Sequence, residues 1–407
     1  MLLELLLIAA GAGSHQEPGS ELGLQDLASP AGPRSSLSNL VRGADGSVVL
    51  SWVDLEPDDV AVMRIAFLGE SGWSEPAEVV RGEDLFLNWA DFPAVAVLES
   101  GTLVAQWLRQ GAEPHGYSAE FSISTDRGAH WSPPRRLHSD DSAAEHGFVS
   151  LVPIDASTFG ALWLDGRAAA GKPHGEGETG LWFRTIDAKG ELGDELVLDP
   201  RVCDCCQTGA VALPTGGLVA LYRDRSVDEV RDISFVRFDA EARRWSDPRP
   251  VHVDGWTIAG CPVNGPRIAA DGDALAAAWY SGVGEGGGCV RIAFAPATTG
   301  SFGEPIDVDA GRPIGRADVV LRADGSAVVT WLESLGEGRA EWRALLVWRD
   351  GRTGKSLPID RVSSGRPAGS LRMITRGADE ILTWTATEGG GGVRTARLRS
   401  RALPEPR

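Results

Sequence analysis

The densest group of chemically versatile side chains in the sequence is residues 223–232, Arg-Asp-Arg-Ser-Val-Asp-Glu-Val-Arg-Asp. Three guanidinium groups and four carboxylates lie within these ten positions. Guanidinium groups hold anions through paired hydrogen bonds, and two carboxyl groups in different surroundings can supply a general acid and a general base. Carboxyl pairs of this kind cleave glycosidic bonds. The stretch is therefore a candidate for binding an anionic sugar and for acid–base chemistry on it.

Shorter polar segments elsewhere in the chain carry the same residue types. They are Asn88–Pro93, Glu145–Phe148, Asp165–Arg167, Cys261–Pro266 and Gly315–Asp318. A second interpretation is that all of these segments are solvated loops whose ion pairs lock neighbouring parts of the fold, because charged loops are common on soluble surfaces. The sequence leaves both interpretations open.

Four of the five cysteines form a second candidate site, and they are Cys203, Cys205, Cys206 and Cys261. In an exported protein the ordinary interpretation is one or two disulfides, for instance Cys203 or Cys206 with Cys261. One alternative is a thiolate site for Cu(I) or Zn with His146 nearby. Another is a strained vicinal Cys205–Cys206 disulfide that lines a ligand pocket. Cys289 lies in an apolar run and is expected to pack as a small buried residue.

A repeated unit must position these residues, and its plainest copy is residues 39–52, an apolar strand, a Gly/Asp turn and a second strand that closes on Trp. The closing aromatic recurs every 52 to 59 residues over nearly the whole chain. A period of this length indicates a repeat architecture, not two or three unrelated domains. The closing residues are Trp52, Trp107, Trp163, Tyr222, Trp279, Trp331 and Trp384.

Each unit predicts four antiparallel strands, because a third alternating run such as 60–67 and a fourth, proline-bearing run such as 73–80 follow the aromatic. Proline fits an outermost strand, which lacks a partner on one side. The fold class is therefore an all-β propeller of seven blades, with six blades and an irregular unit as the alternative. The last unit ends after its third strand, so residues 20–27 are predicted to supply its fourth strand and close the ring.

Blade topology places the candidate residues on one face of the ring. The loops that lead into each first strand and those that join second to third strands lie on the same side and converge on the central axis. All the candidate segments named above fall in such loops. The first-to-second strand turns lie on the opposite face.

The propeller is predicted to span residues 19–400, between an N-terminal segment, 1–18, and a tail, 401–407. Residues 1–14 have an apolar core followed by small residues, as secretory signals do, although Glu4 lies within the core and no basic residue precedes it. We expect an exported, periplasmic or extracellular protein; the alternative is an apolar start on a cytoplasmic chain. The net charge of −18 without a basic run argues against nucleic acid as a partner. We also expect a monomer with no cofactor and no transmembrane segment.

Residues 124–131, Ser-Thr-Asp-Arg-Gly-Ala-His-Trp, carry a family resemblance. They fit the Asp-box, Ser/Thr-x-Asp-x-Gly-x-x-Trp, and the chain thus resembles the sialidase (neuraminidase) superfamily of BNR-repeat propellers. In physical terms the motif is a turn in which Asp126 caps backbone N–H groups and Gly128 permits a positive φ. The segments 203–208, 223–233 and 261–266 further resemble a group of bacterial exported sialidase-like proteins.

The resemblance implies an exo-glycosidase for an acidic, sialic-acid-like sugar. Sialidases hold the substrate carboxylate with three arginines and use a Tyr nucleophile paired with Glu, together with an Asp acid/base. The sequence departs from this pattern, because Tyr222 takes a repeated core position and Arg34–Leu37 is a poor stand-in for the sialidase Arg-Ile-Pro segment. By loop position, the implied catalytic residues are Asp91, Glu145, Glu229 and Asp232, and the implied substrate-binding residues are Asn88, His146, Arg167, Arg223, Arg225, Arg231, Asn264 and Arg316.

Two further functions remain open at the level of sequence. A non-catalytic propeller that binds a glycan or a protein at the cell envelope fits the lack of a recognisable Tyr/Glu pair. A metal- or redox-linked periplasmic protein fits the four clustered cysteines.

Overall fold

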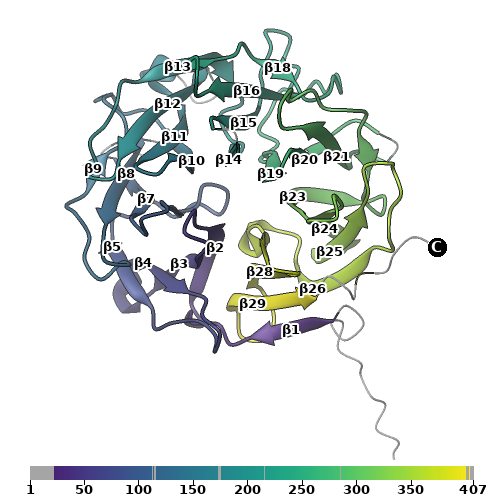
Figure 1. The fold of residues 1–407 in the computed structure, drawn as a ribbon, viewed down its shortest axis with the longest axis horizontal. Helices are drawn as coiled ribbons and strands as arrows, with labels where there is room; N and C mark the ends of the chain where they lie inside the picture. The colour runs from purple at the N-terminus through teal and green to yellow at the C-terminus, as the bar shows by residue number, and fades with distance from the viewer. Residues whose placement is uncertain are drawn as a thin grey trace, which may run out of the picture.

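Seven antiparallel sheets stand around a central axis in the computed structural model (Figure 1). The structure describes residues 23–399 and 403, except 112, 114, 115, 173–175, 215 and 285. The predicted all-β propeller and its seven blades are confirmed. Helical structure within the described residues is limited to the short 3-10 turns η2 (Pro57–Asp59), η3 (Arg167–Ala169) and η4 (Arg366–Ala368). None of these is long and apolar enough to cross a membrane.

The first three blades follow the predicted order of strands from the axis outward. Blade one contains β2 (Ser35–Arg42), β3 (Val48–Leu55), β4 (Ala61–Phe67) and β5 (Ala77–Gly82). Blade two contains β6 (Ala94–Val97), β7 (Leu103–Gln110), β8 (Tyr117–Ser124) and β9 (Arg135–Arg136). Blade three contains β10 (His146–Asp155), β11 (Thr158–Asp165), β12 (Thr179–Asp187) and β13 (Leu196–Val202).

The other four blades complete the ring. Blade four contains β14 (Gly209–Ala212), β15 (Leu218–Arg223), β16 (Ile233–Asp239), β17 (Arg244–Trp245) and β18 (Arg249–Pro250), the last two both paired with β16. Blade five contains β19 (Arg267–Asp271), β20 (Ala274–Ser281), β21 (Cys289–Pro296) and β22 (Ile306–Asp307). Blade six contains β23 (Pro313–Leu321), β24 (Ala327–Gly336), β25 (Arg339–Val347) and β26 (Leu357–Ser363). Blade seven contains β27 (Arg372–Arg376), β28 (Asp379–Ala386), β29 (Gly392–Arg399) and β1 (Leu24–Leu27).

The N-terminal strand β1 closes the ring as predicted, although it is shorter than the expected 20–27, of which 20–22 lie outside the described residues. It pairs antiparallel with β29, with Leu24 opposite Leu398 and Leu27 opposite Thr395. Asp26 also forms an ion pair with Arg394 at 3.2 Å. The edge that β29 would otherwise expose is therefore covered, which removes a template for edge-to-edge association.

The repeated aromatic residues form the centre of each blade. All seven are at most 1% exposed. A buried indole or phenol group needs a hydrogen-bond acceptor, and each donates to a carboxylate at 2.6–3.2 Å. The pairs are Trp52 with Asp54, Trp107 with Glu120, Trp163 with Asp165, Tyr222 with Asp199, Trp279 with Asp254, Trp331 with Glu333 and Trp384 with Asp360.

The Asp-box is a structural turn between β8 and β9. The Asp126 carboxylate accepts the N–H of His130 at 2.9 Å, and the N–H of Gly128 donates to the Ser124 hydroxyl at 2.9 Å. Gly128 has φ +85°, and an added Cβ there would lie 2.8 Å from Ile65 of blade one. Trp131 packs into the cluster of apolar side chains between blades one and two. The motif thus fixes packing between blades and lies away from the candidate residues.

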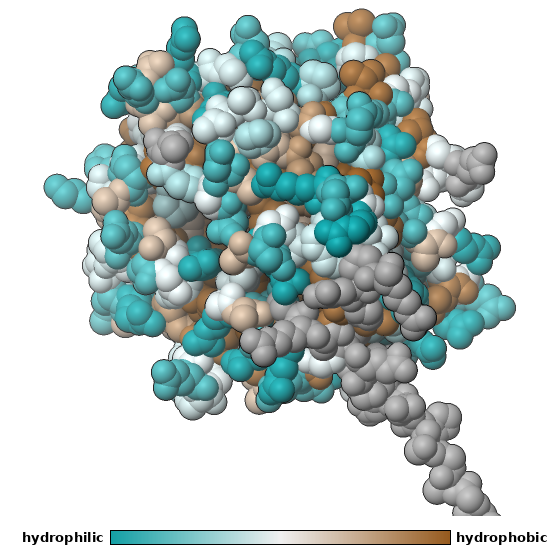
Figure 2. Space-filling view, turned by 45° about the vertical axis from the view of Figure 1, so that its right-hand side comes forward, coloured by the Kyte–Doolittle hydropathy of each residue, from teal (hydrophilic) through white to brown (hydrophobic). Residues whose placement is uncertain are grey.

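The surface visible in Figure 2 is mostly hydrophilic, with apolar residues scattered over it.

Backbone strain is found at one face of the ring, where several first strands begin. Leu37, Phe148 and Arg316 have φ of 56°, 52° and 54°, and each lies at a bulge in the pairing of its first strand. Positive φ is costly for residues other than glycine and is enriched at functional sites.

Candidate functional site

The loops that lead into the first strands, here called lead-in loops, meet around the axis as the sequence predicted. The Gln207 side chain donates to the carbonyl of Ala90 at 2.6 Å and accepts the N–H of Gly265 at 3.2 Å. The Thr208 hydroxyl donates to the carbonyl of Phe148 at 3.0 Å. Residues far apart in the chain, from blades two to five, therefore become neighbours on one face, which we call the lead-in face.

Asn264, in the loop that leads into blade five, links that blade to blades four and six. Its carbonyl accepts two hydrogen bonds from Arg223, at 2.7 and 3.1 Å. Its side-chain oxygen accepts the N–H of Arg316 at 2.7 Å, and its amide donates to the carbonyl of Ile314 at 3.1 Å. The Asn264 side chain is therefore hydrogen-bonded to blade six within the fold, and its contact with a substrate stays a prediction.

Asp91, Tyr117 and Glu145 lie together at the junction of blades two and three. Asp91 is 2% exposed, and its Oδ1 accepts the N–H of Phe148 at 2.7 Å. The Tyr117 hydroxyl interacts with the same carboxyl, although Oδ2 has no partner of ordinary hydrogen-bond geometry. Burial, with a smaller contribution from the charge of Glu145, raises the pKa of Asp91 to about 7, against the lowering effect of the hydrogen bonds from Phe148 and Tyr117. This carboxyl can hold a proton near neutral pH.

Tyr117 is the residue at this junction that the sequence did not single out. It begins β8, is 5% exposed and stacks on Phe86 with ring centroids 4.5 Å apart. Burial and the charges of Asp91 and Glu145 raise its pKa well above the ordinary value, so the phenol is neutral. Its place in an alternating strand resembles that of any core residue, and only the folded position of the loop that leads into the same blade reveals the contact with Asp91.

Glu229 accepts hydrogen bonds from three arginines. Arg225 donates at 2.9 Å, Arg231 at 2.6 Å and Arg201, which the sequence analysis did not select, at 3.3 Å. Hydrogen bonds from Arg225, with a further contribution from Arg231, lower the pKa of Glu229. The carboxylate is therefore ionised and cannot serve as a proton donor near neutral pH. Two of the predicted clamp arginines thus bind a carboxylate of the protein itself.

Arg223 and Asp232 are also occupied within the fold. Arg223 is 2% exposed, donates to the carbonyls of Arg231, Asn264 and Tyr280, and lies over the Trp256 ring at 4.8 Å. The two carboxylate oxygens of Asp232 accept the N–H groups of Gly255 and Trp256 at 2.8 and 3.0 Å. Both residues hold the segment that leads into blade five.

His146 begins β10 and Arg167 begins η3, both in blade three. His146 is fully buried, stacks on His138 at 3.6 Å and lies 3.1 Å from Asp140. Arg167 forms a two-bond contact with Asp165 and lies over the Trp182 ring at 3.8 Å. Neither groups with the cysteines, so the expected participation of His146 in a thiolate site is not observed among the described residues.

A hollow of about 310 Å³ lies on the lead-in face. Trp89 and Leu87, from the loop that leads into blade two, form one wall, and Arg366 from η4 contributes a cation. Asn88 shapes this loop, because its side-chain oxygen accepts the N–H of Ala90 at 3.0 Å. Arg316 lies over the Trp89 ring at 4.2 Å, so this predicted residue supports the wall of the hollow. The full lining is Ser36, Leu37, Leu87, Trp89, Arg366, Pro367, Gly369 and Thr385.

Beneath this wall the first strands contribute two arginines that the sequence analysis missed. Arg267 and Arg372 lie 5.6 and 5.7 Å from the Phe92 ring. Burial lowers the pKa of Arg267 to about 9, and the charge of Arg372 acts in the same direction. Arg372 lies 3.4 Å from Asp318. Their positions in strands, not in loops, concealed them in the sequence.

A larger hollow, of about 590 Å³, lies on the opposite face between blades five and six.

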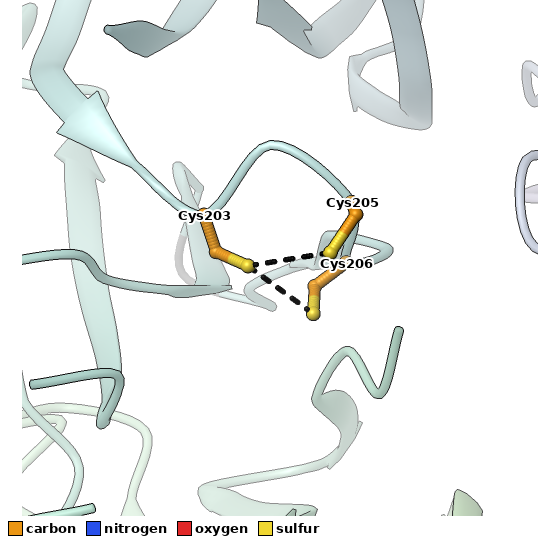
Figure 3. A group of neighbouring side chains, drawn as sticks. All are labelled: Cys203, Cys205 and Cys206. Carbon is orange, nitrogen blue, oxygen red and sulfur yellow. Dashed lines mark hydrogen bonds between the residues drawn. The ribbon is translucent and has the colours of Figure 1, made fainter. Parts of the chain in front are cut away.

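Four cysteines meet where the lead-in loops of blades four and five come together. The Sγ atom of Cys203 lies 3.7 Å from that of Cys205 and 3.5 Å from that of Cys206 (Figure 3). The Sγ of Cys261 lies 3.7 Å from Asp204 Oδ1. All have free thiols, so the predicted disulfides are not present in the described part of the chain. Hydrogen bonding with the thiols of Cys205 and Cys206 lowers the pKa of Cys203 well below the usual value. Cys289 is buried in β21, as expected.

Comparison with known proteins identifies a BNR repeat-like domain over residues 56–256. The resemblance to the sialidase superfamily is thereby confirmed. No curated protein sequence matches the chain.

Solved structures show the fold more widely. An ulvan lyase of polysaccharide lyase family PL25 aligns with a TM-score of 0.55 and 12% identity over 93% of this chain and 95% of that one. The α-L-arabinofuranosidase Arb93A from Fusarium graminearum aligns with a TM-score of 0.50 and 12% identity over 94% and 98%. A Hadza microbial sialidase aligns with a TM-score of 0.48 and 14% identity over 84% and 74%. At these identities the likeness shows the fold alone.

Proposed function

Since a BNR repeat-like domain spans residues 56–256 and the ring is a sialidase-like β-propeller, we propose that this protein acts on carbohydrates and cleaves a glycosidic bond of an acidic sugar at the lead-in face. The observation that carries the proposal is the pair of carboxyl groups Asp91 and Glu145, of which Asp91 holds a proton near neutral pH. Paired carboxyl groups can supply the general acid and the general base that cleave a glycosidic bond.

The hollow beside Trp89 is the binding site in this proposal. Its volume of about 310 Å³ suits one or two sugar rings. An indole face packs against the C–H groups of a sugar, and the exposed guanidinium of Arg366 offers paired donors to a carboxylate. Neighbouring propellers that carry lyase and arabinofuranosidase names are consistent with a sugar ligand.

Asp91 is the proposed general acid. Its backbone N–H bonds to the carbonyl of Asn88 at 3.1 Å, so the acid and Trp89 belong to one turn. Because the Asp91 side chain is 2% exposed, the reaction requires this turn to move when a sugar fills the hollow. The proton then passes from Asp91 to the glycosidic oxygen as that C–O bond breaks. Glu145, as the general base, takes a proton from a water molecule whose oxygen bonds to the anomeric carbon.

The test is hydrolysis of fluorogenic sialosides and uronosides between pH 4 and 8. Asp91→Asn is expected to reduce kcat by about 10²-fold or more, because general acid catalysis typically contributes that factor. Arg366→Ala is expected to raise KM with little change in kcat. The matched control is Asp350→Asn on the opposite face, where the carboxylate is exposed and binds Arg352 at 2.8 Å. Absence of turnover on the whole panel, or full activity of Asp91→Asn, would refute the proposed hydrolysis.

A second candidate function is non-catalytic binding of a glycan. The observation that favours it is the internal use of Arg225 and Arg231 by Glu229, which leaves those arginines engaged without substrate. Calorimetry with the same sugars distinguishes the two candidates. Binding that is weakened by Trp89→Ala and is accompanied by no product would support the binding module.

A further inference from the structure

Three cysteine sulfurs converge on one point next to the axis. Cys203, Cys205 and Cys206 offer sulfur atoms that all lie within 4.8 Å of one another. Cys203 and Cys206 are 1% and 2% exposed, whereas Cys205 is half-buried. Figure 3 shows the three side chains pointing toward one another from a single loop between β13 and β14. No part of the proposed sugar site uses them.

The separations between these sulfurs fit a shared ligand better than a covalent bond. A disulfide holds its sulfurs at about 2.05 Å. The distances from the Cys203 sulfur to the other two are 3.7 and 3.5 Å. A tetrahedral ion with metal–sulfur bonds of about 2.3 Å places two ligand sulfurs about 3.8 Å apart. The sulfur–sulfur distances in this loop are therefore close to those between sulfur ligands of one tetrahedral metal ion.

Two N–H donors point at the sulfurs. The Arg231 guanidinium donates to Cys203 at 3.2 Å, and the backbone N–H of Asn264 donates to Cys206 at 3.3 Å. A neutral thiol is a weak acceptor, whereas a thiolate is a better one, so these donors favour the deprotonated ligand form. Hydrogen bonds to coordinating groups orient them and tune the bound ion.

The surroundings also offset the charge of several thiolates. Arg231 contacts Cys203 directly, and the positive charge of buried Arg223 acts on both Cys203 and Cys206. Because Glu229 and the carbonyl groups of the fold hold these two guanidiniums in place, the positive charge is fixed before any ion binds.

Cys261 stands at the open side of the group. It is exposed, comes from the loop that leads into blade five, and forms a second potential metal-binding group with Asp204 and Cys205, whose ligand atoms lie within 4.8 Å of one another. A fourth ligand from a second loop completes a tetrahedral site, as is usual for structural zinc.

We propose that Cys203, Cys205 and Cys206 bind one thiophilic metal ion, with Cys261 as the fourth ligand. Zn(II) and Cu(I) share the thiolate chemistry required, and they differ in the number of sulfurs they prefer. Zn(II) would use all four cysteines, whereas Cu(I) would be satisfied by the three of the β13–β14 loop.

The experiment uses the full chain, prepared metal-free under a non-thiol reductant, with its five thiols confirmed by titration. Co(II), Zn(II) and Cu(I) are then added separately. We expect one equivalent of Co(II) to give thiolate charge-transfer absorption and the intense visible bands of a tetrahedral site, and Zn(II) to displace it. Loss of the Co(II) signal in Cys261→Ser with Cu(I) binding retained would support a site in which Cys261 is the fourth ligand of a tetrahedral ion and the other three cysteines suffice for Cu(I). An unchanged Co(II) signal in Cys261→Ser would overturn the assignment of Cys261 as a ligand.

The controls separate binding from folding. Cys203→Ser and Cys206→Ser are expected to lose metal binding, whereas Cys289→Ser, whose thiol instead bonds the carbonyl of Val283, is expected to keep it. Because a buried substitution can unfold the chain, the wild-type protein gives a second readout, a Tm that rises with added Zn(II) or Cu(I). Five reduced thiols that bind no metal and show no rise in Tm would overturn the proposal. A mass lower by two hydrogens for each disulfide, with no metal uptake after reduction, would also overturn it.

Discussion

Burial gives Asp91 a proton at a pH where an ordinary aspartate has lost it. The same shift affects stability. Below about pH 4 the carboxyl is protonated in both the folded and the unfolded chain, so it contributes no pH dependence. Between pH 4 and 7 the unfolded chain ionises first, so the folded state loses stability as pH rises, and the loss is complete above the folded pKa of about 7.

We therefore expect the wild-type protein to lose stability relative to Asp91→Asn as pH increases from 4 to 8. The asparagine retains an oxygen for the N–H of Phe148 but cannot carry the buried charge. Urea unfolding of both proteins at pH 4, 5.5 and 8 measures the difference. Parallel stability profiles would show that Asp91 is ionised in the folded state throughout this range.

Gly147 keeps Asp91 and Tyr117 in place. An added Cβ would lie 2.0 Å from the Asp91 Oδ2 and 2.7 Å from the Tyr117 ring, so no side chain fits. We expect Gly147→Ala to destabilise the fold by about 1 to 3 kcal/mol, as overpacking typically does. Gly69→Ala is the matched control, because its nearest contact would be an ordinary 3.5 Å. Equal unfolding free energies for the two variants would contradict the packing shown here.

At the scale of strands and loops, the sequence predicted the blades well, because each repeats an alternating apolar pattern that closes on a buried aromatic. It also placed the lead-in loops on one face. It could not predict the partners of the charged side chains. Whether Arg225 and Arg231 face a ligand or Glu229 depends on distances across a folded loop. Tyr117 and Arg267 lie in strands, and the sequence pattern does not show that the fold brings Tyr117 to Asp91 and Arg267 to Phe92.

The strand β1 is the element whose removal tests ring closure. Deletion of residues 1–27 would leave β29 without the partner that faces it from Leu24 to Leu27. Because each strand hydrogen bond contributes about 1 kcal/mol, we expect a loss of about 2 to 4 kcal/mol and a lower Tm. Deletion of residues 1–22 is the control, and scanning calorimetry is the measurement. An unchanged Tm in the longer deletion would show that the pairing contributes little.

Across the whole molecule, each blade centre joins an aromatic N–H or O–H to a carboxylate. Arginines bind several of these carboxylates in turn, such as Arg64 to Asp54 at 3.1 Å and Arg109 to Glu120 at 2.7 Å. Many of the acidic residues therefore serve the blades and not a ligand.

Tyr222 offers a clean test of this arrangement, since its hydroxyl donates to Asp199 at 2.6 Å in a buried setting. We expect Tyr222→Phe to cost about 1 to 3 kcal/mol, because the volume is kept but the buried carboxylate loses a donor. Tyr280→Phe is the control, since its hydroxyl meets the Gly287 carbonyl at 3.1 Å in an exposed setting. Chemical unfolding measures the free energy of unfolding of both variants. Equal losses of stability in the two would contradict a stabilising role for the buried hydrogen bond between Tyr222 and Asp199.

The pairing of residue 24 with residue 398 also sets the order of events during synthesis. At typical translation rates a ribosome takes roughly 20 to 80 s to make a chain of this length. During that time β1 has no strand to pair with, and the first and last of the blades made so far each lack a neighbouring blade on one side. Completion of the native ring is therefore postponed until β29 has been synthesised, which gives chaperones a long interval in which to bind the unfinished chain.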